Sequence, residues 1–387
     1  MLRDADGWAK LPGMTDSSGP PFRADHVGSL LRPKNLLDAR ARHANGEIDD
    51  AELRGIEDEA IADVVRMQKD VGLRTATDGE FRRASWHMDF IYAIDGITKV
   101  TDQNIVVHFK NSDGSLDYTP AGLHVDGPLS IDRPIFGEDF AYLQSVVGEG
   151  QTPKLTIPSP SMVHYRGGAA AIDPKVYPDE NAFWADLSAA YAQQVQGIAA
   201  QGCTYLQFDD TSLAYLNDPQ QRAELAAQGR DAEHLHERYI RQINASLAGR
   251  PDTLTVTTHM CRGNFRSSWV AEGGYDFVAE ALFGELDVDG FFMEWDDARS
   301  GGFEPLRFVP PGKRVVLGLV TTKRPELERK DDLKRRIDEA SAFVPLEQLA
   351  LSGQCGFSST VEGNSLTRDE QIAKLALIVE TAEEVWG

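Results

Sequence analysis

The stretch "NAFWADLSAAYAQQVQGIAAQGCTYLQFDD", residues 181–210, joins a predicted helix to a predicted strand. Its first part has apolar residues at helical spacing and stops at Gly202, a residue type that commonly ends helices. The run "TYLQFDD" then follows as a short strand that finishes on Asp209 and Asp210. A helix that leads directly into a strand is the repeating unit of a parallel α/β sheet, so the number of such units decides the fold.

The same unit recurs along most of the chain. Further helices are expected over residues 51–72, 231–249, 267–285, 331–343 and 368–386. Further strands are expected at "ADHVGS" (24–29), "RTATDGE" (74–80), "KLTIPSP" (154–160), "DTLTVTTH" (252–259), "DGFFMEWD" (289–296), "KRVVLGLV" (313–320) and "LALSGQCGF" (349–357). About eight strands separated by helices favour an α/β fold of the closed (β/α)8 TIM-barrel type, with an open doubly wound sheet as the alternative.

Two segments lack this alternation of predicted helices and strands. Residues 1–22 are rich in Gly, Ser, Pro and Asp without periodicity, which predicts a flexible N-terminal lead-in. The region near 90–150 is rich in Asp, Gly and Tyr and predicts an inserted hairpin or loop excursion. Residues 23–387 are therefore expected to form a single catalytic barrel domain.

The amino-acid composition of the chain restricts the kinds of molecule that it is expected to bind. The 387 residues carry a formal net charge of -22, and an acidic surface disfavours binding to nucleic acid or to anionic membranes. No apolar run is long enough to span a bilayer and the N-terminus lacks an apolar signal core, so the expected location is the cytoplasm. Three widely spaced cysteines argue against a disulfide framework and leave thiols for the core or for a metal. The oligomeric state is left open, with a homo-oligomer among the alternatives.

Polar residues with chemical potential fall at the carboxyl ends of the predicted strands, which converge on one face of a barrel. Four of them, from neighbouring strands, offer one nitrogen, two sulfurs and one oxygen: His259, Cys261, Glu294 and Cys355. This donor set suits tetrahedral zinc, although buried structural cysteines and an unrelated surface histidine are the alternative. Cys203, at a helix-to-strand junction, is expected to be a core thiol.

The ligand types indicate which chemistry such a zinc ion would support. Two thiolates reduce the Lewis acidity of the metal and favour binding of a further thiolate, in contrast to hydrolytic sites built from histidine and carboxylate. A substrate thiol bound there would lose its proton near neutral pH and become an alkyl acceptor. The residues therefore indicate alkyl transfer onto sulfur.

The motifs "DHVGSLLRP", "DGEFRR", "QFDD", "THMCRGN", "MEWDD" and "SGQCGF", in that order, resemble the catalytic barrel of cobalamin-independent methionine synthase. The chain is most similar to the short single-barrel relatives of that enzyme, a group that includes epoxyalkane:coenzyme M transferase. The resemblance covers about residues 22–386 and implies that His259, Cys261, Glu294 and Cys355 are zinc ligands. It also implies that Ser29, Glu80 and Asp209 bind the thiol substrate, homocysteine in the synthase.

One departure from the family pattern concerns the alkyl donor. Where the full-length synthase has a histidine after its seventh strand, associated with methyl release from folate, this chain has Lys323 in "VTTKRP". An ammonium group is a poor acid at neutral pH unless it is desolvated, which puts a folate donor in doubt. Lys323 and His26 are the candidate proton donors. Trp86, His87, Tyr165 and Trp295 are candidates for a pocket wall that stacks on a flat donor.

The leading hypothesis is a zinc-dependent transferase that moves a methyl or small alkyl group onto a thiol, with homocysteine as acceptor and methionine as product. An alternative keeps the zinc and predicts addition of a thiol to an epoxide, or the reverse lyase reaction on a thioether. A non-catalytic metal-binding or thiol-storage protein is the third hypothesis, which the pocket carboxylates disfavour. The implied partners are a small-molecule thiol and a methyl or alkyl donor.

Overall fold

A computed structural model describes residues 19–101, 107–111, 114–118, 122–165 and 167–387. Its central feature is a six-stranded parallel sheet in the order β12-β11-β10-β9-β8-β7. The strands are β7 (Leu155–Pro158), β8 (Tyr205–Asp210), β9 (Thr255–Met260), β10 (Gly290–Glu294), β11 (Arg314–Val320) and β12 (Leu349–Gly353). Neighbouring strands are consecutive in the chain, which is the arrangement expected of a barrel.

The remaining positions of the barrel are filled by short segments. β1 (Thr75–Ala76) pairs in parallel with β6 (Thr152–Pro153), which lies one residue before β7. The segment around Ala24 forms a parallel bridge with Leu351 of β12. The same segment reaches β1 from the other side, since Leu30 N donates to the carbonyl of Gly79 at 3.1 Å. The sheet therefore closes, and the predicted (β/α)8 barrel is confirmed.

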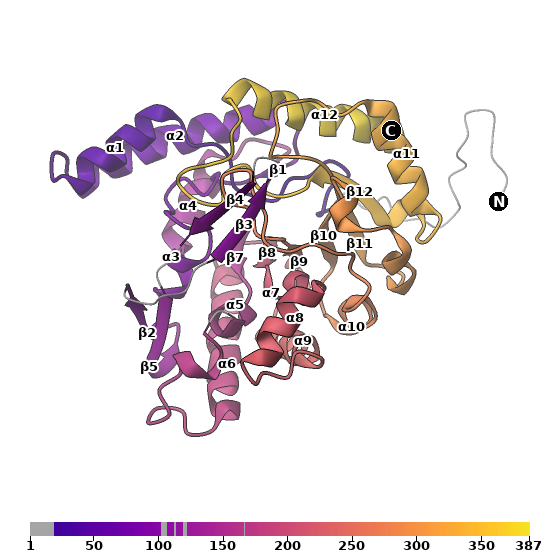
Figure 1. Cartoon of the computed structure of the whole chain (residues 1–387). Coiled ribbons are helices and arrows are strands. Elements are labelled where there is room, and N and C mark those ends of the chain that lie inside the picture. The colour runs from indigo at the N-terminus through magenta and orange to yellow at the C-terminus, as the bar shows by residue number, and fades with distance from the viewer. Residues whose placement is uncertain (1–18, 102–106, 112–113, 119–121, 166) are drawn as a thin grey trace.

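Helices cover the outside of the barrel (Figure 1). The longer ones are α1 (Lys34–Ala44), α2 (Asp50–Asp70), α4 (Gly137–Val146), α6 (Glu180–Ala200), α8 (Pro219–Ala227), α9 (Leu235–Ser246), α11 (Lys330–Ser341) and α12 (Arg368–Trp386). The shorter ones are α3 (Met88–Ile91), α5 (Ser161–Tyr165), α7 (Ser212–Tyr215) and α10 (Ala279–Glu285). Their apolar faces bury the main core against the strands, while a small separate cluster of Val27, Phe292, Val316 and Ala350 lies inside the barrel.

The predicted excursion near 90–150 is confirmed as two antiparallel hairpins. β2 (Asp95–Val100) pairs with β5 (Gly122–Ser130), and β3 (Val107–Asn111) pairs with β4 (Gly114–Tyr118). Figure 1 shows β2 and β5 projecting from the barrel and β3 and β4 lying across it. The predicted lead-in over 1–22 falls mostly on residues 1–18, which lie outside the described residues.

One predicted helix is wrong in its first half. Residues 267–285 were expected to be helical, but the helix α10 begins only at Ala279. Trp269 instead exchanges two backbone hydrogen bonds with Lys110 of β3, at 2.7 and 2.8 Å. Gly273, four residues later, has a φ of 110°, which lies outside the helical region.

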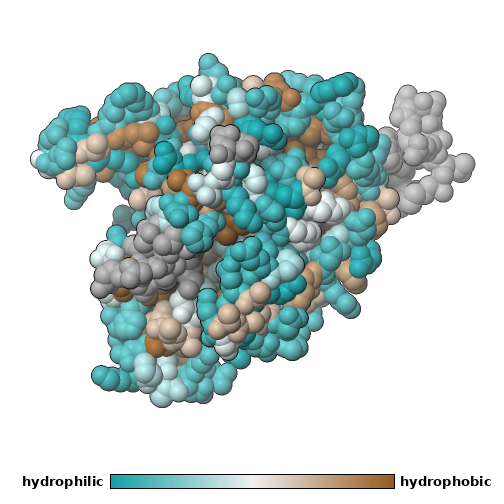
Figure 2. Space-filling model, in the orientation of Figure 1, coloured by the Kyte–Doolittle hydropathy of each residue, from teal (hydrophilic) through white to brown (hydrophobic). Residues whose placement is uncertain are grey.

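The face of the molecule seen in Figure 2 is mainly polar, with hydrophobic residues scattered over it. Within the described ranges, no helix combines the length and apolar character needed to cross a membrane.

Candidate metal centre and substrate residues

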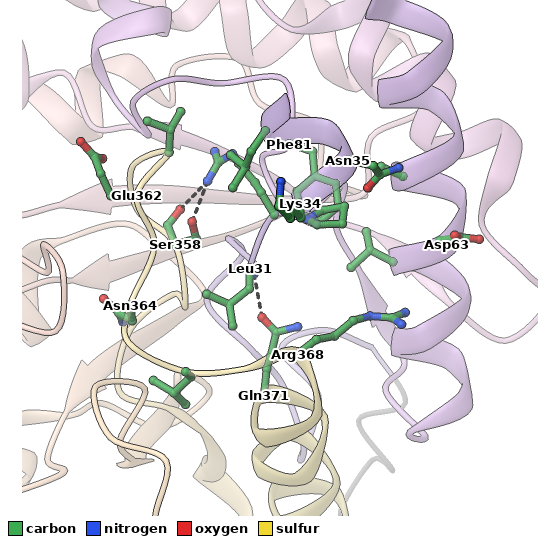
Figure 3. Close-up of a pocket in the computed structure, with 18 of the residues that line it drawn as sticks. Leu31, Lys34, Asn35, Asp63, Phe81, Ser358, Glu362, Asn364, Arg368 and Gln371 are labelled. Atoms are coloured by element: carbon green, nitrogen blue, oxygen red, sulfur yellow. Dashed lines mark hydrogen bonds between the residues drawn. The ribbon is translucent and has the colours of Figure 1, made fainter. Parts of the chain in front are cut away.

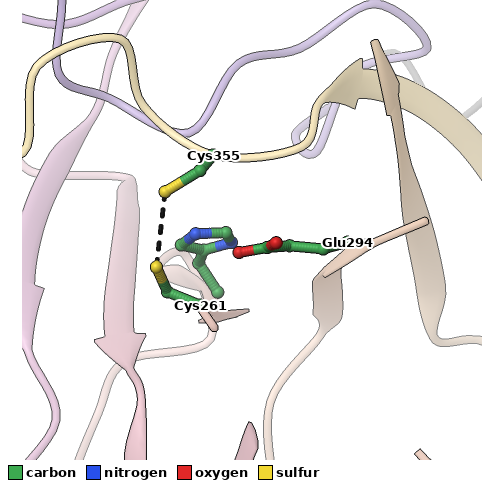
Figure 4. Close-up of side chains that lie close together, drawn as sticks. Cys261, Glu294 and Cys355 are labelled. Atoms are coloured by element: carbon green, nitrogen blue, oxygen red, sulfur yellow. Dashed lines mark hydrogen bonds between the residues drawn. The ribbon is translucent and has the colours of Figure 1, made fainter. Parts of the chain in front are cut away.

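Four predicted ligands come together at the carboxyl ends of three strands (Figure 4). His259 is the fifth residue of β9 and Cys261 follows that strand, Glu294 ends β10, and Cys355 lies two residues beyond β12. All four are buried, and one ligand atom from each lies within 4.8 Å of the others. We call these four residues the ligand cluster.

The contacts of the ligand cluster fit a metal ion. The Sγ atoms of Cys261 and Cys355 are 3.4 Å apart. Glu294 accepts hydrogen bonds from the backbone N–H of Arg262 at 2.9 Å and from the guanidinium of Arg299 at 3.3 Å. Neither ring nitrogen of His259 has a hydrogen-bond partner of normal geometry in the part of the chain described. A buried imidazole normally satisfies its nitrogens, so this one is suited to donate an electron pair to a cation.

The charges in the ligand cluster depend on one another. The hydrogen bond from the Cys355 thiol, with help from His259, lowers the pKa of Cys261 well below its usual value. The same contact raises the pKa of Cys355 well above its usual value. Burial raises the pKa of Glu294, against the effect of Lys323. Two sulfurs, one imidazole and one carboxylate in mutual reach form the donor set preferred by zinc.

The predicted substrate residues lie beside the ligand cluster. Asp209 of β8 is the register partner of His259. Ser29 packs against the residue that follows Cys355: a Cβ atom at Gly356 would lie 2.0 Å from the Ser29 Oγ, so a side chain there would displace Ser29. The charge of Glu80 helps to raise the pKa of Asp209, so the two carboxylates lie near each other. We call Glu80 and Asp209 the carboxylate pair.

Each member of the carboxylate pair is held by neighbours. Glu80 Oε1 accepts a hydrogen bond from Thr156 Oγ1 at 2.9 Å and lies 3.8 Å from the Arg83 guanidinium. Its Oε2 is buried and has no hydrogen-bond partner among the residues described here. Asp209 Oδ1 accepts from Gln207 Nε2 at 2.6 Å. Burial raises the pKa of Asp209 to about 7, against the effect of His259, and it also raises the pKa of Glu80.

Lys323 lies near the ligand cluster as predicted. It is 6% exposed, and its Nζ is 4.0 Å from Asp296 Oδ2. Considering only the described chain, that Nζ is buried and makes no hydrogen bond. Its charge lowers the pKa of Asp296 and opposes the raised pKa of Cys355, so it faces both groups.

His26 is not brought to the ligand cluster. The flanking Val27 belongs to the cluster inside the barrel, and Asp25 contacts Tyr205 and Lys154. Because side chains alternate along an extended segment, His26 faces the opposite way, where its ring interacts with Gln68 of α2. Burial, with Lys154, lowers the pKa of His26 to about 4, so the imidazole is neutral at pH 7. This placement argues against its predicted role as a proton donor.

The four residues predicted as an aromatic wall have different surroundings. Trp86 is partly buried and its ring lies 4.3 Å from that of His87. Tyr165 is buried against Tyr215 at 5.6 Å. Trp295 is a core residue, because it is 1% exposed and packs against Tyr275 and Phe303. Cys203 is 2% exposed, which confirms the expected core thiol.

Sequence reasoning missed the residues that hold the predicted ones in place. Thr156 and Arg83 hold the Glu80 carboxylate, and Arg299 holds the carboxylates of Glu294 and Asp296, the latter at 3.0 Å. Thr156 lies in the predicted strand "KLTIPSP" and Arg83 in the motif "DGEFRR", whereas Arg299 lies two residues beyond the motif "MEWDD". The signal was a charged or hydroxyl residue close to a predicted functional one.

The β3–β4 hairpin lies against the loop that follows Cys261. Besides the backbone pairing of Lys110 with Trp269, the ring of Phe265 lies 5.2 Å from Phe109 and 4.6 Å from Tyr118. The excursion therefore covers part of the loop that carries Cys261, a predicted metal ligand.

Comparisons with known proteins agree with this geometry. The family model described as the catalytic domain of cobalamin-independent synthase matches residues 22–384. The Bacillus subtilis protein YxjG, which is uncharacterized, is 47% identical over 369 residues, 95% of each chain. A solved Listeria monocytogenes structure, named as a candidate vitamin-B12-independent methionine synthase, shares 38% identity with a TM-score of 0.74 and covers 95% of this chain and 98% of its own.

A more distant relative has a named activity. The 5-methyltetrahydropteroyltriglutamate–homocysteine methyltransferase of Thermotoga petrophila is 24% identical over 347 residues. The match covers 88% of this chain and 42% of that enzyme.

Proposed function

Because the chain belongs to the family of cobalamin-independent synthase catalytic domains, we propose that it is a zinc-dependent transferase acting on a small-molecule thiol. It moves a methyl or small alkyl group onto that thiol, and homocysteine is the acceptor. The ligand cluster carries this proposal, because two thiols, a carboxylate and a histidine without hydrogen-bond partners among the described residues meet within 4.8 Å.

Zinc held by His259, Cys261, Glu294 and Cys355 would lower the pKa of a coordinated acceptor thiol toward neutrality. The protein supplies the rest of the acceptor site. Glu80 and Asp209 present carboxylates next to the ligand cluster, and these are complementary to the ammonium group of an amino-acid thiol. An anionic thiol without an amine would leave both carboxylates without an ammonium partner, so the pair favours an amino-acid thiol such as homocysteine over coenzyme M.

Lys323 serves the donor side of the reaction. The acceptor sulfur attacks the alkyl carbon in line, the bond between that carbon and the donor breaks, and the leaving atom takes up a proton. The Lys323 ammonium lies near Asp296 and Cys355, where it can give that proton or neutralise an anionic leaving group. A lysine in this place also suits an alkoxide, and this observation keeps thiol addition to an epoxide as the second candidate.

The proposal is tested by two measurements on the zinc-loaded full chain. Adding homocysteine, coenzyme M or glutathione separately should release protons only with the thiol that binds as an anion, and we expect homocysteine. A donor screen then includes a methyl-folate, an S-methyl sulfonium compound and a small epoxide. Proton release and product only with coenzyme M and an epoxide would contradict the methyl-transfer proposal and establish the second candidate.

Replacing Lys323 by Met separates its role from that of the ligand cluster. We expect zinc content and homocysteine-induced proton release to be unchanged, while turnover falls by about 10²-fold or more, as for loss of a general acid. Unchanged turnover in Lys323→Met would show that this lysine has no part in the donor step.

A further inference from the structure

We propose that Arg32 is a positioning residue that fixes the Glu80 carboxylate relative to the Cys355 sulfur by joining the two loops that carry them. The consequence for turnover rests on the proposed function, whereas the joining of the loops does not. Arg32 lies three residues after Ser29 and is 7% exposed, so its guanidinium acts inside the protein.

The two terminal nitrogens of Arg32 make five hydrogen bonds to these two loops, and Nη1 shares one of its two N–H groups between acceptors. The Arg32 Nη2 donates to the backbone carbonyls of Glu80 at 2.7 Å and Arg83 at 2.8 Å. Its Nη1 donates to Ser358 Oγ at 2.7 Å, to the Ser358 carbonyl at 3.2 Å and to the Thr360 carbonyl at 3.0 Å. The fixed fork of a guanidinium can face two loops at once, which a single ammonium cannot do.

On the first loop, Arg32 holds a backbone that has little intrinsic preference for its shape. Glu80 has a φ of 61°, a left-handed conformation that costs free energy for residues other than glycine. The loop follows a strand of only two residues, β1, so the sheet provides few hydrogen bonds to hold it. The bond from Arg32 to the Glu80 carbonyl therefore fixes the backbone from which the carboxylate projects.

On the second loop, Arg32 holds the chain just beyond a metal ligand. Ser358 lies three residues after Cys355, and its N–H donates to Ser29 Oγ at 3.3 Å. Phe357 N–H donates to the Ser29 carbonyl at 2.9 Å. Ser29 and Arg32 thus bind the same short segment from one side.

The two loops also pair directly farther along, since Trp86 N–H donates to the Ser359 carbonyl at 3.0 Å and Val361 N–H donates to the Ala84 carbonyl at 3.2 Å. Arg32 adds the bonds that tie the Glu80 end of that pairing to Ser358.

The outer side of this junction borders an open cavity (Figure 3). The cavity has a volume of about 510 Å³, and Arg32, Ser358 and Asn364 form part of its wall near the start of α12. Figure 3 shows Ser358 and Asn364 on the loop and Gln371 on the helix, with Gln371 bonded to the backbone of Leu31. Because Arg32 borders this open cavity, a small guanidinium ion from solution can reach the space that removal of the Arg32 side chain creates.

Arg32→Ala and Arg32→Lys test the role in the zinc-loaded full chain. We expect both to keep zinc and to raise the KM for homocysteine by about 10- to 100-fold, the scale of a misplacement near 1 Å. The lysine of Arg32→Lys keeps the positive charge, but its ammonium group reaches only one of the two loops. The KM of Arg32→Lys should therefore stay close to that of Arg32→Ala. Methylguanidine should restore the KM of Arg32→Ala and leave Arg32→Lys unchanged, because only the alanine variant vacates the site.

Arg40→Ala is the matched control. Arg40 also donates to backbone carbonyls of the first loop, those of Phe81 and Arg83, but the described structure gives it no bond to the Ser358 loop. We expect its KM for homocysteine to stay within about twofold of the wild type, since loops held elsewhere move little. If Arg40→Ala and Arg32→Ala raise the KM equally, the joining of the two loops is not the cause and the proposal fails.

Amide hydrogen exchange provides a readout that is independent of turnover. Exchange at Phe357 and Ser358 should accelerate in Arg32→Ala and not in Arg40→Ala, and unchanged exchange would overturn the proposal. A wild type that never uses homocysteine, combined with faster exchange in Arg32→Ala, would contradict the proposed function and support the joining of the loops.

Discussion

The ligand cluster and the carboxylate pair lie side by side, yet they are built in opposite ways. In the ligand cluster, the two sulfurs share a contact of 3.4 Å, and His259 has no regular hydrogen bond within the described residues. In the carboxylate pair, Thr156, Arg83 and Gln207 already contact one oxygen of each acid, although Glu80 keeps one oxygen without a partner in the described chain. Under the proposed function an ion would complete the ligand cluster, while the protein itself preorganises the carboxylate pair.

This difference shows which part of the site depends on the metal. Buried polar atoms without partners destabilise a folded protein, so the ligand cluster should be less stable without its ion. The carboxylate pair should keep its geometry in the metal-free protein. Removing a residue from one side should therefore leave the other side intact.

The largest effect is expected from Cys261→Ala and Cys355→Ala. Each should abolish high-affinity zinc binding and reduce thiol alkylation to background, because one of the two thiolates is lost and only three ligands remain. The measurement is zinc content after gel filtration, together with turnover. Cys203→Ala is the control and should keep both, since Cys203 lies in the core away from the cluster. A Cys261→Ala, Cys355→Ala double variant with full zinc and turnover would refute the assigned centre.

A smaller, selective effect is expected from Glu80→Gln and Asp209→Asn. Each substitution removes a charge opposite the substrate ammonium, and the KM for homocysteine should rise about 10- to 100-fold, the scale of a charged hydrogen bond. Zinc content should be unchanged. As a paired measurement, 4-mercaptobutyrate is homocysteine without the amine, and its KM should not rise in the variants. Loss of zinc from Asp209→Asn would contradict the separation between the two sides.

Acidification should weaken the carboxylate pair before it affects the fold. Burial raises the pKa of Asp209 to about 7, so this carboxyl is mostly ionised at pH 8 and mostly protonated at pH 6. The KM for homocysteine should therefore rise about tenfold from pH 8 to pH 6, and Asp209→Asn should lose this dependence. A raised folded-state pKa gives stability that is present at low pH and lost as pH rises through 7, so Asp209 itself does not promote acid unfolding. An equally steep profile in Asp209→Asn would assign the pH effect to another group.

The places of these residues in the fold were more predictable from the sequence than the groups that their side chains contact. Barrel strands end at one face, so His259, Cys261, Glu294 and Cys355 could be brought together from strand order alone. The direction of His26 could not, because the first strand of the barrel is a single bridge at Ala24 and gives a weak alternation signal. Arg32 binds backbone groups far from it in the sequence, and no local pattern specifies such partners. Arg299 binds Glu294 and Asp296, which lie within five residues of it.

The 267–285 segment shows how a tertiary contact overrides helical spacing. Its apolar residues suit a helix, yet Trp269 pairs with β3 of a hairpin more than 150 residues earlier in the chain. The helix consequently starts at Ala279. The sequence of either segment alone does not contain that pairing.

The smallest effect is expected from loosening this hairpin. Phe109→Ala removes the ring that packs at 5.2 Å on Phe265, four residues beyond Cys261. The hairpin is an excursion, so the barrel should stay folded while turnover changes by about two- to fivefold, as expected for a loop that covers a site. The sharper readout is the rate at which a thiol reagent modifies the metal-free protein. Burial raises the pKa of Cys203 to about 12, so the reaction should come from the ligand cluster, and it should accelerate in Phe109→Ala. His108→Ala, on the exposed face of the same hairpin, should react as the wild type does, and equal rates in all three proteins would show that the hairpin does not shield the metal side.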